Sequence, residues 1–371
     1  MRFICDTQIL CSACLQVQRA VSTKSTIPSI EGILIKALGN ELILTGYDLE
    51  MGINTSVEAN VQENGSVIIN ARVLCDILRK LPYETVSFDV DGRNMVIIKS
   101  GDIKYSLIGL SADEYPELPT VSGGFPIILD LPLLKNMVRQ TAFSVAVGDS
   151  SKMVYTGIKF EISENNLKLI AVDGFRMAIR NEKIDYSGEE FSFIVPAKTL
   201  TEVIKIVENS DGKISLGIGK RHIVFEAENY RIVSRLLDGK FLNYKANIPP
   251  TYAMSVEVDV DTFASSIDRI SLILTDKNKS PVRCVFEDNY INISSNTALG
   301  YANDRIPAEI TGDRIEIGFN NRFITDALKV CDVERVKIEL TSATSPIIIT
   351  PVEGDNFLFL ILPVRLKADN Q

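Results

Sequence analysis

Apolar and polar positions alternate along this chain in short runs, and three helical segments interrupt these runs with closely similar patterns. Within each segment, apolar residues recur three and four positions apart, as expected for a helix that buries one face. Runs with a two-residue period, typical of strands, lie on both sides. The segments match in residue type at nearly every position and recur about every 125 residues: Ala71–Arg79, Ala197–Lys205 and Asn321–Lys329.

The other parts of this unit recur in the same order. An earlier helix is predicted in each third of the chain, over 6–21, 130–142 and 261–272, and Asp6 is a suitable N-cap for the first. Pairs of strands joined by a polar turn follow these helices, at 32–37 and 41–45, 157–162 and 167–172, and 283–286 and 290–294. Further strands are predicted after the second helices, at 85–90, 213–218 and 335–340, each leading into a hairpin turn.

The chain is therefore predicted to contain three copies of one α+β unit of about 120 residues, a usual domain size. Each copy has two helices and about eight strands, and the alternating pattern favours antiparallel sheets with one buried face. Proline-containing joins near 121–126 and 248–251 mark linkers. The predicted domains are 1–122, 127–248 and 251–371.

Basic residues occupy two equivalent positions, seven apart, in each copy of the second helix. At about 100° per residue, a spacing of seven returns to nearly the same face. Apolar residues fall on the opposite side, for example Leu74, Ile77 and Leu78 in the first copy. Each helix should pack one face on its sheet and present a pair of cations: Arg72 and Arg79, Lys198 and Lys205, and Arg322 and Lys329.

Two interpretations of these cations remain open. Asp76, Glu202 and Asp326 lie four residues after the first cation of each helix, so the helices could be ordinary solvated faces with internal ion pairs. The same pattern in three copies of a chain with a net charge of −9 instead favours a local surface for sequence-independent phosphate contacts. Further cations on the earlier helices support that second interpretation: Lys135, Arg139 and Arg269.

The composition narrows the class of protein further. No apolar run approaches the length of a membrane span, and Asp6 interrupts the apolar core that a signal peptide would need, so a cytoplasmic location is expected. Six cysteines fit a reducing compartment. Cys11 and Cys14 form a CxxC, but the chain has no second CxxC or histidine pair. These two are therefore interpreted as small apolar residues of a helix, and no metal or cofactor is predicted.

Six segments, in order, together resemble the bacterial DNA sliding clamp family, the beta subunit of DNA polymerase III. The resemblance covers Met1 to Leu366. The segments that carry it are Ser25–Pro28, Leu44–Glu50, Asp113–Pro119, Ala171–Ala178, Leu237–Phe241 and Leu362–Leu366.

This resemblance implies a clamp fold, in which two subunits join head to tail as a ring of six similar domains around duplex DNA. The ring performs no chemistry; it tethers the replicative polymerase, and an ATP-driven loader opens and closes it. The basic helix faces would line the hole, where weak phosphate contacts suffice because the ring is topologically linked to DNA. Implied partners are a second copy of the chain, duplex DNA, the polymerase, the clamp loader, and repair and translesion polymerases.

The resemblance also implies a pocket between the second and third domains, into which partners insert short apolar motifs. An apolar slot with a few polar anchors suits that role. Phe175, Leu242 and Ala246 differ from the residues of better-known members, so the preferred motif is left open. The matching positions are Tyr155, Val172, Gly174, Phe175, Arg176, Met177, Leu242, Asn320, Phe323, Pro346, Leu360, Ile361, Leu362, Pro363, Val364, Arg365 and Leu366.

Smaller sets of residues follow from the same resemblance. Lys24 and Lys152 match basic loop positions that face the hole, whereas Met153 and Val154 replace an aromatic pair that contacts DNA in some members. The tail Lys367–Gln371 extends beyond the usual ending, and its role is left open. The subunit interface is expected to bring one pair of residues from the first domain to another pair from the third: Lys104 and Tyr105, with Leu272 and Ile273.

Two other classes of function are alternatives to a clamp. An enzyme is disfavoured because His222 is the one histidine and the sequence contains no nucleophile, phosphate-binding or metalloprotease motif. Asp48 and Asp173 occupy similar turns, but Asn296 lies near that place in the third copy, which favours a structural role over acid–base chemistry. A scaffold that binds proteins without encircling DNA would favour neutral or acidic residues at the repeated basic positions.

Overall fold

The computed structural model describes residues 1–121, 126–148, 152–274 and 281–366. These residues form two compact units, Met1–Leu133 with Lys198–Leu236, and Leu134–Ala197 with Leu237–Gln371. Neither unit coincides with one sequence repeat, because strands of successive repeats pair in shared sheets. The predicted domain limits of 1–122, 127–248 and 251–371 therefore stay a prediction, and residues 122–125 and 367–371 lie outside the described residues.

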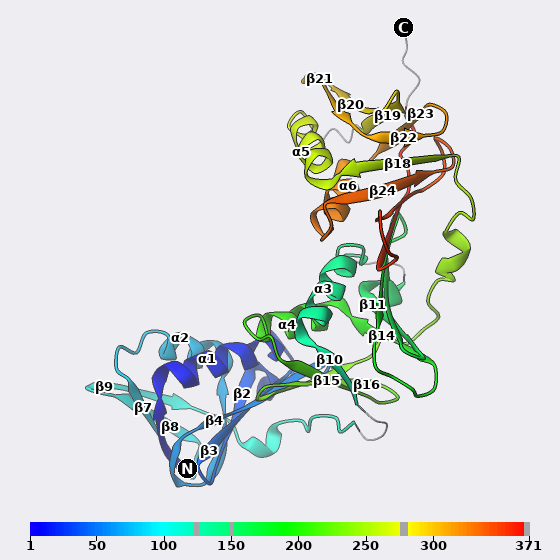
Figure 1. Cartoon of the computed structure of the whole chain (residues 1–371). Helices are drawn as coiled ribbons and strands as arrows, with labels where there is room; N and C mark the ends of the chain where they lie inside the picture. The colour runs from blue at the N-terminus through cyan, green and yellow to red at the C-terminus, as the bar shows by residue number, and fades with distance from the viewer. Residues whose placement is uncertain (122–125, 149–151, 275–280, 367–371) are drawn as a thin grey trace. The chain divides into compact units, whose positions relative to one another are not determined.

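The first repeat contains two α-helices, α1 (Thr7–Val17) and α2 (Ala71–Leu78). Asp6 caps α1, as predicted, because its carboxylate accepts hydrogen bonds from the backbone N–H groups of Gln8 and Ile9 at 2.8 and 2.9 Å. Helix α1 packs against α2 and against two of the strands (Figure 1). The strands are β1 (Arg2–Asp6), β2 (Gly32–Leu38), β3 (Glu41–Tyr47), β4 (Met51–Glu58), β5 (Asn60–Glu63), β6 (Gly65–Asn70), β7 (Thr85–Val90), β8 (Met95–Ser100) and β9 (Ile103–Ile108).

The second and third repeats follow the same plan, with helices at the predicted places. They are α3 (Leu131–Ala142), α4 (Ala197–Ile206), α5 (Val260–Ser271) and α6 (Asn321–Lys329). The second repeat has β10 (Ile127–Asp130), β11 (Gly157–Ser163), β12 (Asn166–Val172), β13 (Arg176–Lys183), β14 (Phe191–Pro196), β15 (Lys213–Ile218), β16 (His222–Ala227) and β17 (Tyr230–Arg235). The third has β18 (Met254–Asp259), β19 (Val282–Glu287), β20 (Tyr290–Thr297), β21 (Gly300–Pro307), β22 (Glu309–Thr311), β23 (Ile315–Phe319), β24 (Arg335–Leu340), β25 (Ile347–Pro351) and β26 (Phe357–Ile361).

Successive repeats join edge to edge through antiparallel strand pairs. Strand β4 pairs with β17 in the sheet β10-β15-β16-β17-β4-β3-β2-β6, and β13 pairs with β26 in the sheet β14-β11-β12-β13-β26-β25-β24-β18-β22. In the remaining sheets, β5-β1-β7-β8-β9 and β21-β20-β19-β23, the strands equivalent to the junction strands lie at an edge. Strand β9 corresponds to β17 and β26, and β21 corresponds to β4 and β13. The strand pairs within the described residues are antiparallel, so the predicted α+β fold with antiparallel sheets is confirmed.

The hairpin registers define equivalent residues in the three copies. In the hairpin that leads into each junction strand, a residue at or next to the end of one strand faces the second residue of the next: Tyr47↔Gly52, Val172↔Met177 and Asn296↔Tyr301. The apolar side of each second helix is buried or half-buried as predicted, on Leu74, Leu200 and Ile324 among others. The buried face fixes each helix on its sheet, and the opposite face is left to solvent.

Candidate functional site

The predicted cations of the second helices lie on exposed faces. The side chains of Arg72, Lys198 and Arg322 are 88%, 70% and 79% exposed. Arg79, Lys205 and Lys329, one heptad later, are also exposed. The three copies therefore place an equivalent pair of cations in solvent, opposite the buried apolar side.

The carboxylate on each of these helices decides how much of that positive charge remains. In α2, Asp76 lies 3.9 Å from Arg72 and 3.0 Å from Arg79. In α4, Glu202 pairs with Lys205 at 2.8 Å and with Arg19, which follows α1, at 2.9 Å. Burial disfavours the charged form of Glu202, but hydrogen bonds from Lys205 and Arg19 outweigh burial and lower its pKa.

In α6 the carboxylate is also taken by an arginine from the preceding repeat. Asp326 accepts a hydrogen bond from Arg176 at 2.7 Å and lies 3.8 Å from Arg322. Glu202 and Asp326 thus serve the joins between repeats, which was not predicted. Arg176 takes the shorter contact with Asp326, so Arg322 is cancelled less than the sequence spacing suggested. In α4, Glu202 also pairs with Lys205 of the same helix, and Lys198 meets Asp48 at 3.5 Å instead.

The remaining predicted DNA-facing residues differ in their surroundings. Lys24 and Lys152 are exposed, and the Lys152 ammonium lies 5.5 Å from the Tyr155 ring centre. Arg139 is exposed and donates to Asn136 at 2.8 Å, whereas Lys135 is half-buried. Arg269 donates to Asp304 at 3.1 Å, and this hydrogen bond lowers the pKa of Asp304.

In the loop after Lys152, Met153 is exposed but Val154 is buried in an apolar cluster of the second unit. A direct contact of Val154 with a ligand in solvent is therefore unavailable in this conformation. Met153 can still offer an apolar surface.

Several predicted pocket residues belong to that apolar cluster. Val172, Met177 and Leu360 are buried in it, while Tyr155 and Leu242 pack against it from partly exposed positions. They come together because Met177 on β13 pairs with Val172 on one side and with Leu360 of β26 on the other. Phe241, Tyr244 and Ile348 complete the cluster and were not predicted. Phe241 closes the motif Leu237–Phe241, which was the available signal.

A second group of predicted residues, here called the rim cluster, surrounds the turn between β12 and β13. Asp173 accepts the backbone N–H groups of Phe175 and Arg176 at 2.9 and 3.0 Å, and Gly174 adopts a φ of +95° that favours glycine. The Phe175 side chain is 61% exposed and stacks on Phe323, with ring centres 6.1 Å apart. The turn therefore presents an aromatic pair at the surface.

The buried Arg176 side chain contacts several members of the rim cluster at once. Its side chain is only 8% exposed, and its guanidinium lies 4.7 Å from the ring centre of Phe323 and 5.5 Å from that of Phe143. Nε pairs with Asp173 at 2.8 Å and Nη1 with Asp326 at 2.7 Å. Cation–π contacts and two charge-assisted hydrogen bonds fix its position. Phe143 and Asp326 were not among the predicted site residues, since their contacts with Arg176 join residues that are distant in the sequence. Asp173 contacts only its near neighbours here and was predicted as a turn residue, not as part of the pocket.

The C-terminal segment completes the rim cluster. The N–H of Leu362 donates to the carbonyl of Phe175 at 2.9 Å, and the N–H of Val364 donates to the carbonyl of Gly318 at 2.8 Å. Ile361 is buried between β13 and β25, and Leu366 lies against Gly318. The remaining predicted members are the helix cap Asn320 and Pro346, Pro363 and Arg365, which are partly or fully exposed.

The equivalent turn between the first two repeats lacks the aromatic pair. Asp48 accepts backbone N–H groups there as Asp173 does, and it also meets Lys198 at 3.5 Å. The strand registers place Glu50 and Thr199 where the second junction has Phe175 and Phe323. Asp48 and Asp173 are therefore both turn-forming residues, as the sequence suggested.

The lone histidine and the CxxC have unremarkable surroundings. His222 begins β16, and partial burial together with Arg235 and Arg221 lowers its pKa. Cys14 is buried in α1, and burial raises the pKa of its thiol. No three His, Cys, Asp or Glu side chains in the described ranges are grouped to hold a metal ion. No helix in those ranges is long and apolar enough to cross a membrane.

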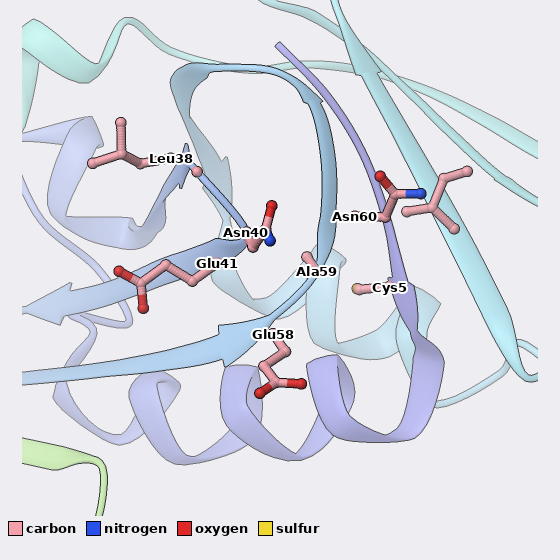
Figure 2. A pocket seen from close by; sticks show the side chains of 9 residues that line it. Cys5, Leu38, Asn40, Glu41, Glu58, Ala59 and Asn60 are labelled. Atoms are coloured by element: carbon pink, nitrogen blue, oxygen red, sulfur yellow. The ribbon is translucent and has the colours of Figure 1, made fainter.

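One open hollow of about 1000 Å³ lies in the first repeat, away from these residues. Figure 2 shows Cys5, Glu41 and Glu58 carried around it by β1, β3 and β4. Glu41 and Glu58 face each other directly in the β3–β4 register. None of the predicted site residues lines this hollow.

The predicted interface residues occupy strand and helix ends. Lys104 and Tyr105 lie on β9, at the edge of its sheet, with Lys104 exposed and Tyr105 half-buried. Leu272, just after α5, is 82% exposed, and Ile273 is half-buried.

Comparison with known proteins identifies the family. Residues 1–119, 129–243 and 245–365 match the N-terminal, central and C-terminal domains of the DNA polymerase III beta subunit. The beta sliding clamp of Bacillus subtilis strain 168 is 31% identical over 377 residues, covering 98% of this chain and 100% of that protein.

Solved structures agree. A putative DNA polymerase III beta subunit from Eubacterium rectale is 34% identical with a TM-score of 0.95, covering 99% of this chain and 100% of that one. A sliding clamp from Pseudomonas aeruginosa bound to griselimycin is 25% identical with a TM-score of 0.92, at the same coverage. The resemblance seen in the sequence is confirmed. The chain belongs to the DNA polymerase III beta subunit family, the sliding clamps, which are non-catalytic processivity factors of DNA replication.

Proposed function

We propose that two copies of this chain close head to tail into a ring around duplex DNA in the cytoplasm. Support comes from the way repeats join inside the chain. At each internal junction, the strand after the repeated aspartate turn pairs with the last strand of the next repeat, as β4 with β17 and β13 with β26. By the same rule, β21 should pair with β9 of a partner subunit, because these two edge strands are the equivalent ones left open.

The internal registers set the register of this proposed pair. Gly52 pairs with Val233, and Met177 pairs with Leu360. Tyr301 is equivalent to Gly52 and Met177, and Ser106 is equivalent to Val233 and Leu360, because they occupy the same places in their hairpins. We therefore expect Tyr301 to face Ser106 of the partner subunit.

The same equivalence supports the predicted interface pair. Phe143 contacts Phe359 across the second internal junction, with ring centres 5.2 Å apart. Leu272 stands at the position of Phe143, after its early helix, and Tyr105 stands at the position of Phe359 in its last strand. Leu272 should therefore pack on Tyr105 of the partner subunit, with Lys104 and Ile273 beside them.

Within the ring, the exposed cations of α2, α4 and α6 would face DNA. Lysine and arginine side chains on helices contact phosphates without reading bases, which suits a protein that slides. Because the whole chain has a net charge of −9, the excess of acidic residues would then lie on the rest of the surface. Lys24, Lys135, Arg139 and Lys152 would add to the same face, while Arg269 would contribute less because Asp304 binds it.

The apolar cluster and the rim cluster together are proposed as the partner pocket. The supporting observation is the exposed Phe175 stacked on Phe323. Phe175 lies in the turn between Val172 and Met177 of the apolar cluster, against which the half-buried Tyr155 and Leu242 pack. Apolar side chains from a short peptide motif of the polymerase, clamp loader or repair and translesion polymerases would pack there. Griselimycin, to which a related clamp is bound, can be tested as a competitor.

The decisive experiment loads the protein onto nicked circular DNA with a clamp loader and ATP, then linearises the circle. Retention on the circle and loss through the free ends would establish topological linkage. Equal binding to both forms would contradict the ring and favour the scaffold, which binds proteins without encircling DNA. A loader that is active on the B. subtilis clamp provides the positive control.

A further inference from the structure

One carboxylate oxygen lies between the two proposed sites. Asp326 Oδ2 accepts from Arg176 Nη1 at 2.7 Å and lies 3.8 Å from Nε of Arg322. Arg176 belongs to the rim cluster of the partner pocket, whereas Arg322 is one of the exposed cations proposed to face DNA. The two guanidinium groups therefore share one anionic partner.

The pocket side of this arrangement is nearly closed to solvent. The Arg176 side chain is 8% exposed and that of Asp326 is 30% exposed. A charge with so little access to water depends on its counter-ions for a fixed position. Arg176 in turn lies 4.7 Å from the ring centre of Phe323, the inner half of the exposed aromatic pair. Asp326 thus positions the aromatic floor of the pocket through Arg176.

On the proposed DNA-facing side, the same oxygen can neutralise Arg322, so Arg322 is available to phosphates only while Arg176 binds Asp326. Arg322 is 79% exposed and approaches Asp326 only at long range, because the shorter contact goes to Arg176. If Arg176 released Asp326, the carboxylate would be free to neutralise Arg322, its i,i+4 neighbour on α6. A cation that is neutralised locally contributes less to phosphate binding.

We propose that Asp326 is a positioning residue shared by the partner pocket and the DNA-facing surface, holding Arg176 in place for partners and leaving Arg322 available to DNA. This inference rests on the proposed function of both surfaces. Its distinguishing feature is a pair of opposite effects: removing the carboxylate weakens peptide binding and strengthens DNA association.

Helix α2, the equivalent of α6 in the first repeat, provides a matched control. Asp76 occupies the equivalent position on α2 and contacts Arg72 at 3.9 Å, but its second partner is Arg79 of the same helix. Asp76→Asn removes the same charge from an equivalent helix that contributes no residue to the apolar cluster or to the rim cluster. The comparison of Asp326→Asn with Asp76→Asn therefore separates the charge effect from the positioning effect.

The experiment measures both affinities on the full-length protein by fluorescence anisotropy. The probes are a labelled short peptide ending in Leu-Phe, displaced by griselimycin, and a short labelled duplex over a range of salt concentrations. Both variants should bind the duplex more tightly, with a slope of log K against log salt that is steeper by up to about 0.9. Asp326→Asn alone should lose about tenfold or more in peptide affinity, as expected when a charged hydrogen bond is removed.

A second substitution guards against simple misfolding. Arg176→Lys keeps the charge but loses the two-pronged contact to Asp173 and Asp326. It should weaken peptide binding and also weaken duplex binding, because Asp326 can then turn to Arg322. A folding defect would instead lower both affinities in Asp326→Asn as well, which would overturn the proposal.

The outcomes separate this inference from the proposed function. Unchanged peptide affinity in Asp326→Asn, with tighter duplex binding in both Asn variants, would overturn the shared role and leave the DNA-facing surface standing. No change of duplex binding in either variant would remove the DNA-facing assignment itself. Weaker peptide binding in Asp326→Asn alone, tighter duplex binding in both Asn variants, and weaker binding of both probes in Arg176→Lys would establish the proposal.

Discussion

Truncation of Leu272 should weaken ring closure far more than any comparable change elsewhere. Its side chain is 82% exposed in the single chain and is proposed to pack on Tyr105 of the partner subunit. Burying a leucine stabilises an interface by about 1.5–3 kcal/mol relative to exposure. Leu272→Ala should therefore destabilise each interface by about 2 kcal/mol, or roughly 30-fold in its equilibrium constant.

A ring of two subunits contains this contact twice, so the free energy of dissociation into monomers should change by twice the effect on one interface. The expected loss is about 4 kcal/mol, which raises the dissociation constant of the dimer about a thousandfold. Sedimentation velocity over a concentration series measures this constant directly. Leu38 is a matched control, since it is also an exposed leucine but lies beside the hollow of the first repeat.

Three outcomes bear on the reasoning. A thousandfold weaker dimer in Leu272→Ala, with Leu38→Ala unchanged, supports the interface derived from the internal junctions. Equal, small effects in both variants would mean that Leu272 is not covered, and the proposed pairing of β21 with β9 would be wrong. Monomers of Leu272→Ala should retain the thermal stability of the fold, because the residue is exposed within its own chain.

Further predictions concern DNA, peptide and acid. Changing Arg72, Lys198 and Arg322, the first cation of each second helix, to Glu should abolish retention on nicked circles, while the sedimentation coefficient still reports a dimer. Normal retention would mean that these three residues do not face DNA. Deleting Leu362–Leu366 should abolish binding of the Leu-Phe peptide, and Phe175→Ala should weaken it about tenfold; intact binding would contradict the pocket. Because the pKa of Glu202 lies below its ordinary value of 4.5, the pair with Arg19 stabilises the fold above that pH and loses this contribution as pH falls through the lowered pKa. Unfolding free energy should thus fall less on acidification in Glu202→Gln than in the unaltered chain, and parallel curves would refute that role.

The sequence predicted elements and their order well because both depend on local periodicity. Strands such as β7, β15 and β24 begin and end at the predicted residues. Helix α1 ends at Val17, short of the predicted 21, because residues 18–20 tighten into a 3₁₀ turn. The repeats made these local patterns more secure, since each was seen three times.

The partners of the ionic side chains could not be predicted in this way. Sequence spacing suggested that Glu202 and Asp326 pair with the first cation of their own helices, whereas Arg19 and Arg176 of the preceding repeats take the shorter contacts. These contacts join residues more than a hundred positions apart, and only the pairing of β4 with β17 and β13 with β26 brings them together. For the same reason Phe143, which contacts Phe359 across the second junction, was absent from the predicted site.

Equivalent junctions with different side chains explain why one backbone plan can yield separate functions. At the first junction, Glu50 and Thr199 stand where the second has Phe175 and Phe323, and Leu118 of the following linker lies against Gly52. The linker therefore covers a position that Met177 fills at the second junction, where the aromatic pair is left exposed.

The third junction would lie between subunits, and the same positions there carry Leu299 and, on the partner subunit, Val73. Both side chains are exposed in the single chain, at 70% and 42%, although each is apolar. Their exposure has no use in a monomer, but pairing of β21 with β9 would bring them together where Phe175 meets Phe323. A single rule of strand pairing thus accounts for the joins inside the chain and for the exposed apolar residues at its two open edges. Because the rule assigns each of these residues one specific counterpart, crosslinking Leu299→Cys to Val73→Cys tests it directly.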